Sequence, residues 1–328
     1  MREELCGALI VAVVAVAPLG CATTSDVHVD PLLENAARLP VPDVEVRIPS
    51  LSNCTSAQDV DLRLTRHEPV AVFVHGCFAS MGQFRSLADV FAFRGQQSVC
   101  FNYDDRDSLE VSSAQLIQAL SALAKAIAPP VIEVVGHSQG GLVARRAFIG
   151  NRPDRFAVEN VDVRLTTISA PFAGIRAASH CGSKALKWAS LGLVKPICRL
   201  ITGKKYKEIP PNSDFMLNPG ELLPVVSRHL KIETDEADSC RRYNDRGVCT
   251  EDDYVFSLEE QSQPALAGDP GLSSVVVKSG HVAIVGDVDT APTKLIDVFQ
   301  REGVLDSSSA QSQGDLAELL ARLYGSPP

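Results

Sequence analysis

The sequence lacks the spacing of cysteines and histidines that marks a metal or redox site. It contains no Cys-x-x-Cys pair, and its 7 histidines are scattered along the 328 residues. Structural zinc sites and thioredoxin-like motifs need closely spaced ligands or thiols. We therefore expect neither a bound metal nor thiol redox chemistry.

The sequence also has fewer basic than acidic residues. The chain has 31 Lys and Arg against 40 Asp and Glu, a formal net charge of -9, and no long acidic block. Binding to phosphates requires a positive footprint, so nucleic acid is not expected as a partner. With 45% hydrophobic and 22% charged residues and no internal repeat, the sequence favours one large α/β domain.

The apolar stretch at the start of the chain is too short to span a bilayer comfortably. It runs uncharged from Leu5 to Ala17 and is followed by Pro18-Leu19-Gly20-Cys21 and a polar segment. This resembles a bacterial lipoprotein signal, and we predict that residues 1–20 are removed and that Cys21 carries lipid. The protein would then be anchored to a membrane surface of the cell envelope, on the periplasmic side or outside. The alternative is an ordinary signal peptide or an uncleaved anchor.

The remaining cysteines favour an oxidising compartment. Two pairs, Cys181 with Cys198 and Cys240 with Cys249, would close short loops in regions without strong periodicity. We expect these two pairs to form disulfides.

Apolar runs and helical patterns alternate along the middle of the chain, which predicts a mostly parallel, doubly wound sheet. We expect a tether over residues 21–43, a folded domain over 44–305 and a tail over 306–328 with a short helix at about Leu316 to Tyr324. The expected strands are VEVRIP and VDLRL as an antiparallel opening, then PVAVFVHG, SVCFNY, VIEVV, RLTTISAP, RHLKIET and LSSVVVKSGH.

A candidate nucleophile, Ser138, stands in Gly136-His137-Ser138-Gln139-Gly140, directly after an apolar strand and before a helix. G-x-S-x-G in this context lifts a serine on a sharp turn, which needs small neighbours such as Gly136 and Gly140. The alternative is a glycine-rich turn whose serine only caps the helix.

Serine needs a base, and the base needs an acid that orients it. Of the histidines beyond Ser138, we favour His281 over His180 and His229, because it follows the last apolar strand and leaves room for an acid before it. We expect Asp252 to be this acid. Asp253 is the second choice, and Asp235 and Asp238 are the third.

Backbone N–H groups can stabilise the oxyanion that develops in acyl transfer. The two expected donors are Gln139, which follows the nucleophile, and Cys77, which follows His75-Gly76 at the end of a buried strand. For His75 itself we prefer a packing role to a catalytic one.

The segments PVAVFVHG, GHSQGG, TISAPFAG, DDYV and SGH together resemble the α/β-hydrolase superfamily in its bacterial lipase and esterase branch, over about Val44 to Gln300. The resemblance implies a hydrolase fold with a cap or lid over about residues 172–225, an ester or lipid substrate and no organic cofactor. Phe172 stands where many relatives have histidine. We thus expect a lipase or carboxylesterase that forms an acyl-enzyme. A thioesterase or acyltransferase with the same triad, and a non-catalytic binding protein, are the alternatives.

One basic segment, from Lys184 to Lys207, interrupts the acidic chain and contains its one tryptophan, Trp188. Apolar residues with a cationic rim suit an anionic lipid surface, so this segment is a candidate lid with Lys204, Lys205 and Lys207 in its rim. The alternative is a solvated cap packed on the core.

Overall fold

The computed structural model describes residues 39–54, 61–77, 81–178, 203–287, 290–306 and 310–324. The predicted signal, Cys21, His180, Trp188 and the predicted Cys181–Cys198 pair lie outside these residues. Among the described helices, none is long and apolar enough to cross a membrane.

A seven-stranded sheet forms the centre of the domain, in the order β11-β8-β7-β6-β4-β5-β2. The strands are β2 (Leu51–Ser52), β4 (Val70–Val74), β5 (Gln97–Phe101), β6 (Val131–His137), β7 (Asp162–Ile168), β8 (Val226–Asp235) and β11 (Ser273–Lys278). All neighbours run parallel except β2, which pairs with β5 in the antiparallel sense. The prediction of a mostly parallel sheet is confirmed.

The connections between these strands supply the helices. They are η1 (Met81–Phe84), α2 (Arg85–Phe93), α3 (Leu109–Ile127), α4 (Gln139–Ala147), η2 (Arg176–Ala178), η3 (Gly203–Lys207), α8 (Asp214–Leu217), α9 (Leu258–Gln261), η4 (Pro264–Gly268), α10 (Thr293–Arg301) and α11 (Ala310–Tyr324). The predicted tail helix therefore begins earlier than expected, at Ala310 instead of about Leu316.

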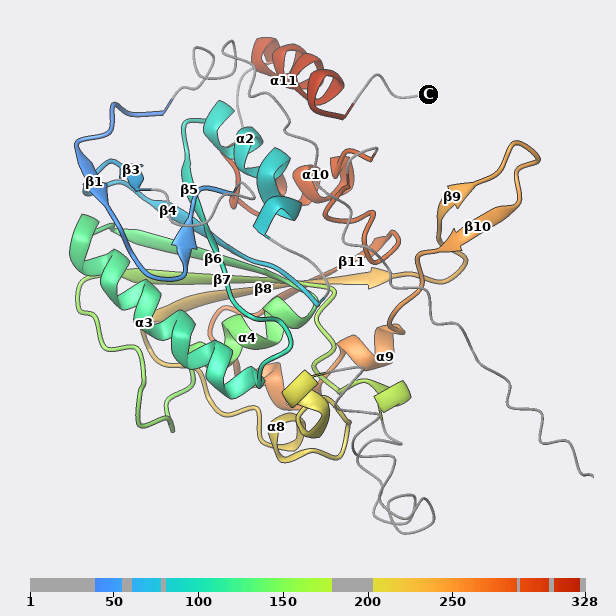
Figure 1. Ribbon diagram of the computed structural model, residues 1–328, viewed down its shortest axis with the longest axis horizontal. Helices are drawn as coiled ribbons and strands as arrows, with labels where there is room; N and C mark the ends of the chain where they lie inside the picture. Colours follow the sequence, from blue (N-terminus) through green and yellow to red (C-terminus); the bar gives the residue numbers. More distant parts are fainter. Residues whose placement is uncertain are drawn as a thin grey trace, which may run out of the picture.

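Helices cover both faces of the sheet, with α3 and α4 on one face and α2, α10 and α11 on the other (Figure 1). Alternation along β4 explains the two layers, because successive side chains of a strand point to opposite faces. Val70, Val72 and Val74 enter the apolar cluster under α3 and α4, while Ala71 and Phe73 enter the cluster under α2 and α10. Both faces are buried, as a parallel sheet requires.

Two small antiparallel pairs flank the sheet. β1 (Val44–Val46) pairs with β3 (Leu62–Leu64), as the opening alternation predicts. β9 (Cys240–Tyr243) and β10 (Cys249–Asp252) form a hairpin that projects from the domain (Figure 1) and is closed by the expected Cys240–Cys249 disulfide. A second disulfide, Cys54–Cys100, was not predicted, and Cys77 is a free thiol.

Asp89 on α2 gives the fold a measurable pH dependence. Burial raises the pKa of this carboxyl to about 6, although Arg85 opposes the shift. The folded state therefore holds the proton more tightly than the unfolded chain, and stability falls as pH rises from about 4 to about 6. At about 1.4 kcal/mol per pKa unit, the ionised carboxylate costs on the order of 3 kcal/mol at neutral pH.

We expect Asp89→Asn to raise the free energy of unfolding at pH 7.5 and to change it little at pH 4. Urea titrations at both pH values measure this, and an equal gain at both would contradict the assignment.

Candidate active site

Ser138 occupies a sharp turn between β6 and α4. Its backbone lies at φ 55° and ψ −124°, an unusual conformation for a residue with a side chain. The flanking glycines allow this turn: a Cβ on Gly136 would lie 2.5 Å from the Gly140 carbonyl oxygen, and a Cβ on Gly140 would lie 2.2 Å from that of Val74. The turn therefore has the strand-to-helix geometry that the G-x-S-x-G motif predicts.

His281 lies beside this turn, although it is distant in sequence. The preceding residue of the turn, His137, donates Nε2–H to the His281 carbonyl oxygen at 2.9 Å, and the two rings are 4.8 Å apart. Burial lowers the pKa of His137 well below its usual value, so this ring is neutral. His137 thus links the turn of Ser138 to the loop that carries His281.

The carboxylate that contacts His281 belongs to Glu236, directly after β8. Its Oε1 accepts from His281 Nδ1 at 2.9 Å and from Thr234 Oγ1 at 2.8 Å. Its Oε2 accepts from the backbone N–H groups of Val255 at 2.6 Å and Phe256 at 2.8 Å. The Glu236 side chain is fully buried, and these four donors compensate its loss of hydration.

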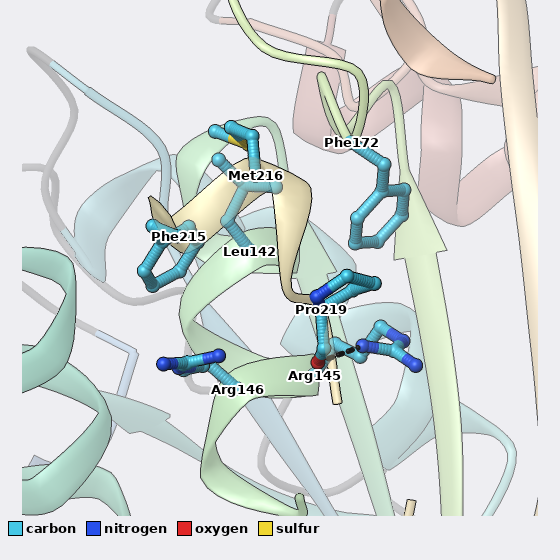
Figure 2. Close-up of a pocket in the computed structure, with 7 residues that line it drawn as sticks. All are labelled: Leu142, Arg145, Arg146, Phe172, Phe215, Met216 and Pro219. Atoms are coloured by element: carbon cyan, nitrogen blue, oxygen red, sulfur yellow. Dashed lines mark hydrogen bonds between the residues drawn. The ribbon is translucent and has the colours of Figure 1, made fainter. Parts of the chain in front are cut away.

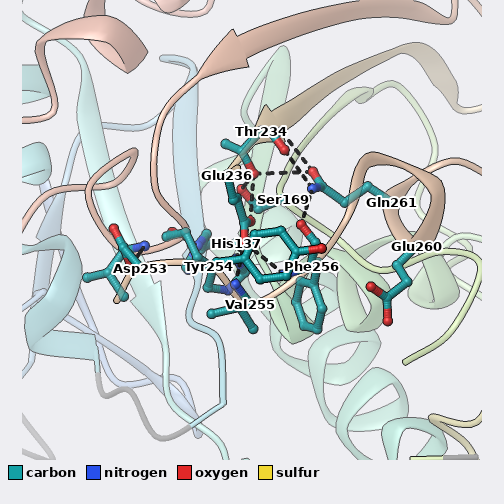
Figure 3. Close-up of polar contacts among 12 residues, drawn as sticks. His137, Ser169, Thr234, Glu236, Asp253, Tyr254, Val255, Phe256, Glu260 and Gln261 are labelled. Atoms are coloured by element: carbon teal, nitrogen blue, oxygen red, sulfur yellow. Dashed lines mark hydrogen bonds and ion pairs between the residues drawn. The ribbon is translucent and has the colours of Figure 1, made fainter. Parts of the chain in front are cut away.

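A further set of polar contacts fixes the strand end from which Glu236 extends (Figure 3). The side-chain amide of Gln261 bonds both the N–H and the carbonyl of Thr234, each at 2.8 Å. The Thr234 hydroxyl also lies 2.7 Å from the hydroxyl of Ser169, at the end of β7. Because these buried groups satisfy one another, they hold the Glu236 carboxylate in one orientation.

The structure does not bring Asp252, the predicted acid, to His281. Asp252 ends β10 on the projecting hairpin, is exposed, and accepts a hydrogen bond from the Tyr254 backbone N–H at 3.0 Å. The sequence favours Asp252 over Asp253 because the apolar pair Tyr254-Val255 is expected to pack the loop down, whereas the hairpin moves Asp252 away from the sheet edge. The sequence prediction missed Glu236, which directly follows β8; the candidates in this segment were Asp235 and Asp238. Asp235 instead contacts Lys278, and Asp238 is exposed.

Asp253, the second candidate, has a supporting position. Its two carboxylate oxygens accept from the backbone N–H groups of Val282 and Ala283, each at 2.9 Å, and its carbonyl accepts from the His281 N–H at 2.9 Å. The side chain is buried. Asp253 therefore holds the loop of His281 instead of contacting the imidazole.

The expected oxyanion donors, Cys77 and Gln139, come from neighbouring segments. Cys77 follows β4 and Gln139 begins α4, and the Ser138 Cβ lies 3.0 Å from where a Cβ on Gly76 would stand. Burial raises the pKa of the Cys77 thiol, and the nearby Lys205 opposes this shift. The structure thus brings both residues to the turn of Ser138.

Two other described histidines, His75 and His229, serve the core. His75 is buried, its Nδ1 lies 3.0 Å from the Gly76 carbonyl oxygen, and its ring stacks on Tyr103 at 4.4 Å. His229 is fully buried between Thr167 Oγ1 at 3.0 Å and Asp269 Oδ2 at 2.7 Å. These contacts favour a packing role for both. In the described part of the chain, no group of three or more His, Cys, Asp or Glu residues could hold a metal ion.

A small apolar pocket lies on the outer side of α4 (Figure 2). Phe215 lies on one side of Leu142 there and Phe172 and Pro219 on the other, and Arg145 donates from Nη1 to the Pro219 carbonyl at 2.7 Å. Neither Ser138, His281 nor Glu236 lines it. Phe172 is therefore a packing residue at this pocket.

The basic segment differs from the expected cationic rim where the structure describes it. The Lys205 side chain is only 3% exposed, and the Lys204 ammonium lies 3.1 Å from the Asp107 carboxylate. Lys205 therefore cannot face a lipid surface. Lys207 is exposed, and Trp188 lies outside the described residues.

Comparison with known proteins agrees with this geometry. The model of the class 2 lipase family matches residues 67–219. No curated protein sequence matches the chain. The lipase BlEst2 of Bacillus licheniformis in its propeptide form superposes with a TM-score of 0.51 at 16% identity, over 74% of this chain and 51% of that chain.

Two further solved structures are similar. The mature form of the same lipase gives a TM-score of 0.49 at 15% identity, over 72% of this chain and 91% of that one. The esterase Est2 of Thermogutta terrifontis with bound butyrate gives 0.44 at 15% identity, over 80% and 97%. The shared fold and the turn of Ser138 show an α/β-hydrolase fold, and the family match over residues 67–219 makes the chain similar to the class 2 lipases, which supports an ester-hydrolysing enzyme.

Proposed function

We propose that the protein is a serine ester hydrolase in which Ser138, His281 and Glu236 form the catalytic triad. The observation that carries this proposal is the buried Glu236 carboxylate on His281 Nδ1, in a loop held against the turn of Ser138. The chain order Ser138, Glu236, His281 is the order that this fold uses. A glutamate replaces the aspartate that the sequence favoured, and its chemistry as an orienting acid is the same.

The reaction follows from these positions. His281 Nε2 takes the proton of the Ser138 hydroxyl, and Oγ attacks the ester carbonyl carbon. The N–H groups of Cys77 and Gln139 donate to the oxyanion of the tetrahedral intermediate. His281 then returns its proton to the leaving alkoxide, and an acyl group remains on Ser138. Water, deprotonated by His281, attacks this acyl-enzyme and releases the acid.

Glu236 acts through the other ring nitrogen. By accepting from Nδ1–H it fixes the tautomer in which Nε2 carries the free lone pair, and it stabilises the imidazolium that forms on proton transfer. Because Glu236 is already satisfied by Thr234, Val255 and Phe256, its position does not change during the reaction.

Labelling with a fluorophosphonate tests the proposal. We expect one adduct, on the peptide that contains Ser138, and none on Ser138→Ala. A short ester substrate in excess should slow the labelling. An adduct on a different serine, or no adduct on the native protein, would exclude the triad.

Ester hydrolysis, thioester hydrolysis and acyl transfer differ in the leaving group of the substrate or in the molecule that accepts the acyl group. We propose ester hydrolysis over thioester hydrolysis or acyl transfer, because both the family match and the similar structures are lipases and esterases. Comparing kcat/KM for an ester and a thioester of the same acyl group decides between them. A series of acyl lengths separates a lipase from a carboxylesterase.

We also propose that the protein is exported and anchored to a membrane surface through lipid on Cys21, on the strength of the leader sequence. The mass of the mature amino-terminal peptide tests this. An unmodified terminus at another residue would exclude the lipid anchor and leave export standing.

A further inference from the structure

We propose that Lys205 is a positioning residue of the oxyanion hole. The ammonium of Lys205 joins the side chains of the two residues whose backbone N–H groups are the proposed oxyanion donors. This inference rests on the proposed function, since it assigns the supporting group of the same site.

The contacts of this ammonium are all made inside the protein. Nζ lies 3.0 Å from the Cys77 thiol and donates to the side-chain carbonyl oxygen of Gln139 and to the backbone carbonyl of Asp105. Gln139 closes the set, because its Nε2 donates to the same Asp105 carbonyl at 2.9 Å. Three segments, those that follow β4 and β5 and the start of α4, are thus tied to one cation.

The segment that carries Lys205 is itself held to the rest of the fold. The neighbouring Lys204 donates its backbone N–H to the Arg106 carbonyl at 2.7 Å, and its ammonium pairs with Asp107 at 3.1 Å. Shortly after, Glu208 accepts from the Leu109 N–H at 2.6 Å with its Oε2. The helix η3 therefore docks on the loop after β5, and Lys205 enters the site from a fixed base.

A buried ammonium is costly unless its partners compensate it, so its position needs a physical reason. Here the compensation is specific: three acceptors contact Nζ, and the Asp105 carboxylate lies 3.9 Å away. The result is that Cys77 and Gln139 are fixed relative to each other before substrate binds. Oxyanion donors contribute most when they need no reorganisation at the moment of reaction.

The test compares Lys205→Met, which keeps an unbranched side chain of similar length but removes its charge, with Lys204→Met. Lys204 is the matched control, because it belongs to the same helix and forms an ion pair but does not contact Cys77 or Gln139. We expect Lys205→Met to lower kcat for p-nitrophenyl butyrate by roughly 10- to 100-fold, with KM within about twofold. For Lys204→Met, both kcat and KM should stay within about twofold of the native values.

A second readout separates positioning from simple loosening of the fold. A trifluoromethyl ketone forms a hemiketal oxyanion on the serine, so its inhibition constant should rise in step with the fall in kcat, while KM does not move. Lys205→Arg should recover part of kcat. If Lys205→Met does not fold by circular dichroism, Gln139→Leu removes the acceptor and keeps the backbone N–H, and the same fall in kcat is expected.

A folded Lys205→Met variant with native kcat would overturn the inference. A fall in kcat in Lys204→Met as large as that in Lys205→Met would overturn it too. An unchanged kcat in Gln139→Leu would do the same. These results are distinct from a failure of the proposed function, which would appear as absent hydrolysis and absent Ser138 labelling in the native protein. In that case the inference falls with it.

Discussion

Ser138→Ala and His281→Ala are each expected to lower kcat for a short soluble ester by roughly 10⁴- to 10⁶-fold, because each removes a group on which both halves of the reaction depend. The two losses should not add. Without the hydroxyl there is no nucleophile for His281 to activate, so the double variant should be no slower than the slower single one. Steady-state kinetics with a coloured ester measures all three.

The fold serves as the control for these variants. Ser138 and His281 are nearly buried, but alanine is smaller than either, and the glycine contacts of the turn do not involve the hydroxyl. Thermal unfolding should therefore stay cooperative in each. A folded His281→Ala protein with near-native turnover would show that another group is the base.

Glu236→Gln should lower kcat by on the order of 10³- to 10⁴-fold with little change in KM. A glutamine keeps the shape but replaces one accepting oxygen by a donating NH₂ group. That group would face either the N–H groups of Val255 and Phe256 or the Nδ1 of His281. The first arrangement opposes donors to donors and costs stability. The second turns the imidazole to the wrong tautomer and costs catalysis.

The neighbouring aspartates provide the matched comparison. Asp252→Asn should leave kcat within about twofold, since its exposed carboxylate contacts only its own turn. Asp253→Asn should lower kcat more than Asp252→Asn and less than Glu236→Gln. One of its two bonds to the Val282 and Ala283 N–H groups is lost, and the His281 loop loosens. If Asp252→Asn is the most damaging of the three, the assignment of Glu236 is wrong.

The parts of this protein that the sequence predicted are those with local causes. The buried strands follow from continuous apolar runs, and the turn of Ser138 follows from glycines that stand next to it in the chain. The places of Ser138 and His281 in the fold follow for the same reason, since Ser138 directly follows β6 and His281 comes shortly after β11. Cys240–Cys249 closes a short hairpin and was predicted, whereas Cys54–Cys100 joins segments 46 residues apart and has no local signal.

The parts that were missed depend on contacts between distant segments. Glu236 is distinguished from Asp252 only by where the chain goes after β8, and no residue type near either one encodes this. Lys205 looked like one basic residue among several in a basic segment. Its burial follows from the docking of η3 on the loop after β5, which brings together residues about a hundred positions apart.

Residues can be added to the β9–β10 hairpin without changing the shape of the site. The chain leaves the sheet edge after Glu236 and returns at Asp253, where the Asp253 N–H meets the Ser239 carbonyl at 3.3 Å. The Cys240–Cys249 bond joins the two strands just beyond this point, and the turn around Asn244 to Val248 is exposed. Extra residues at that tip would add loop to a closed stem, and the cost of a longer loop grows only slowly. The tip is therefore a place where a reporter or a binding peptide can be carried above the catalytic edge without altering the distance from Glu236 to His281.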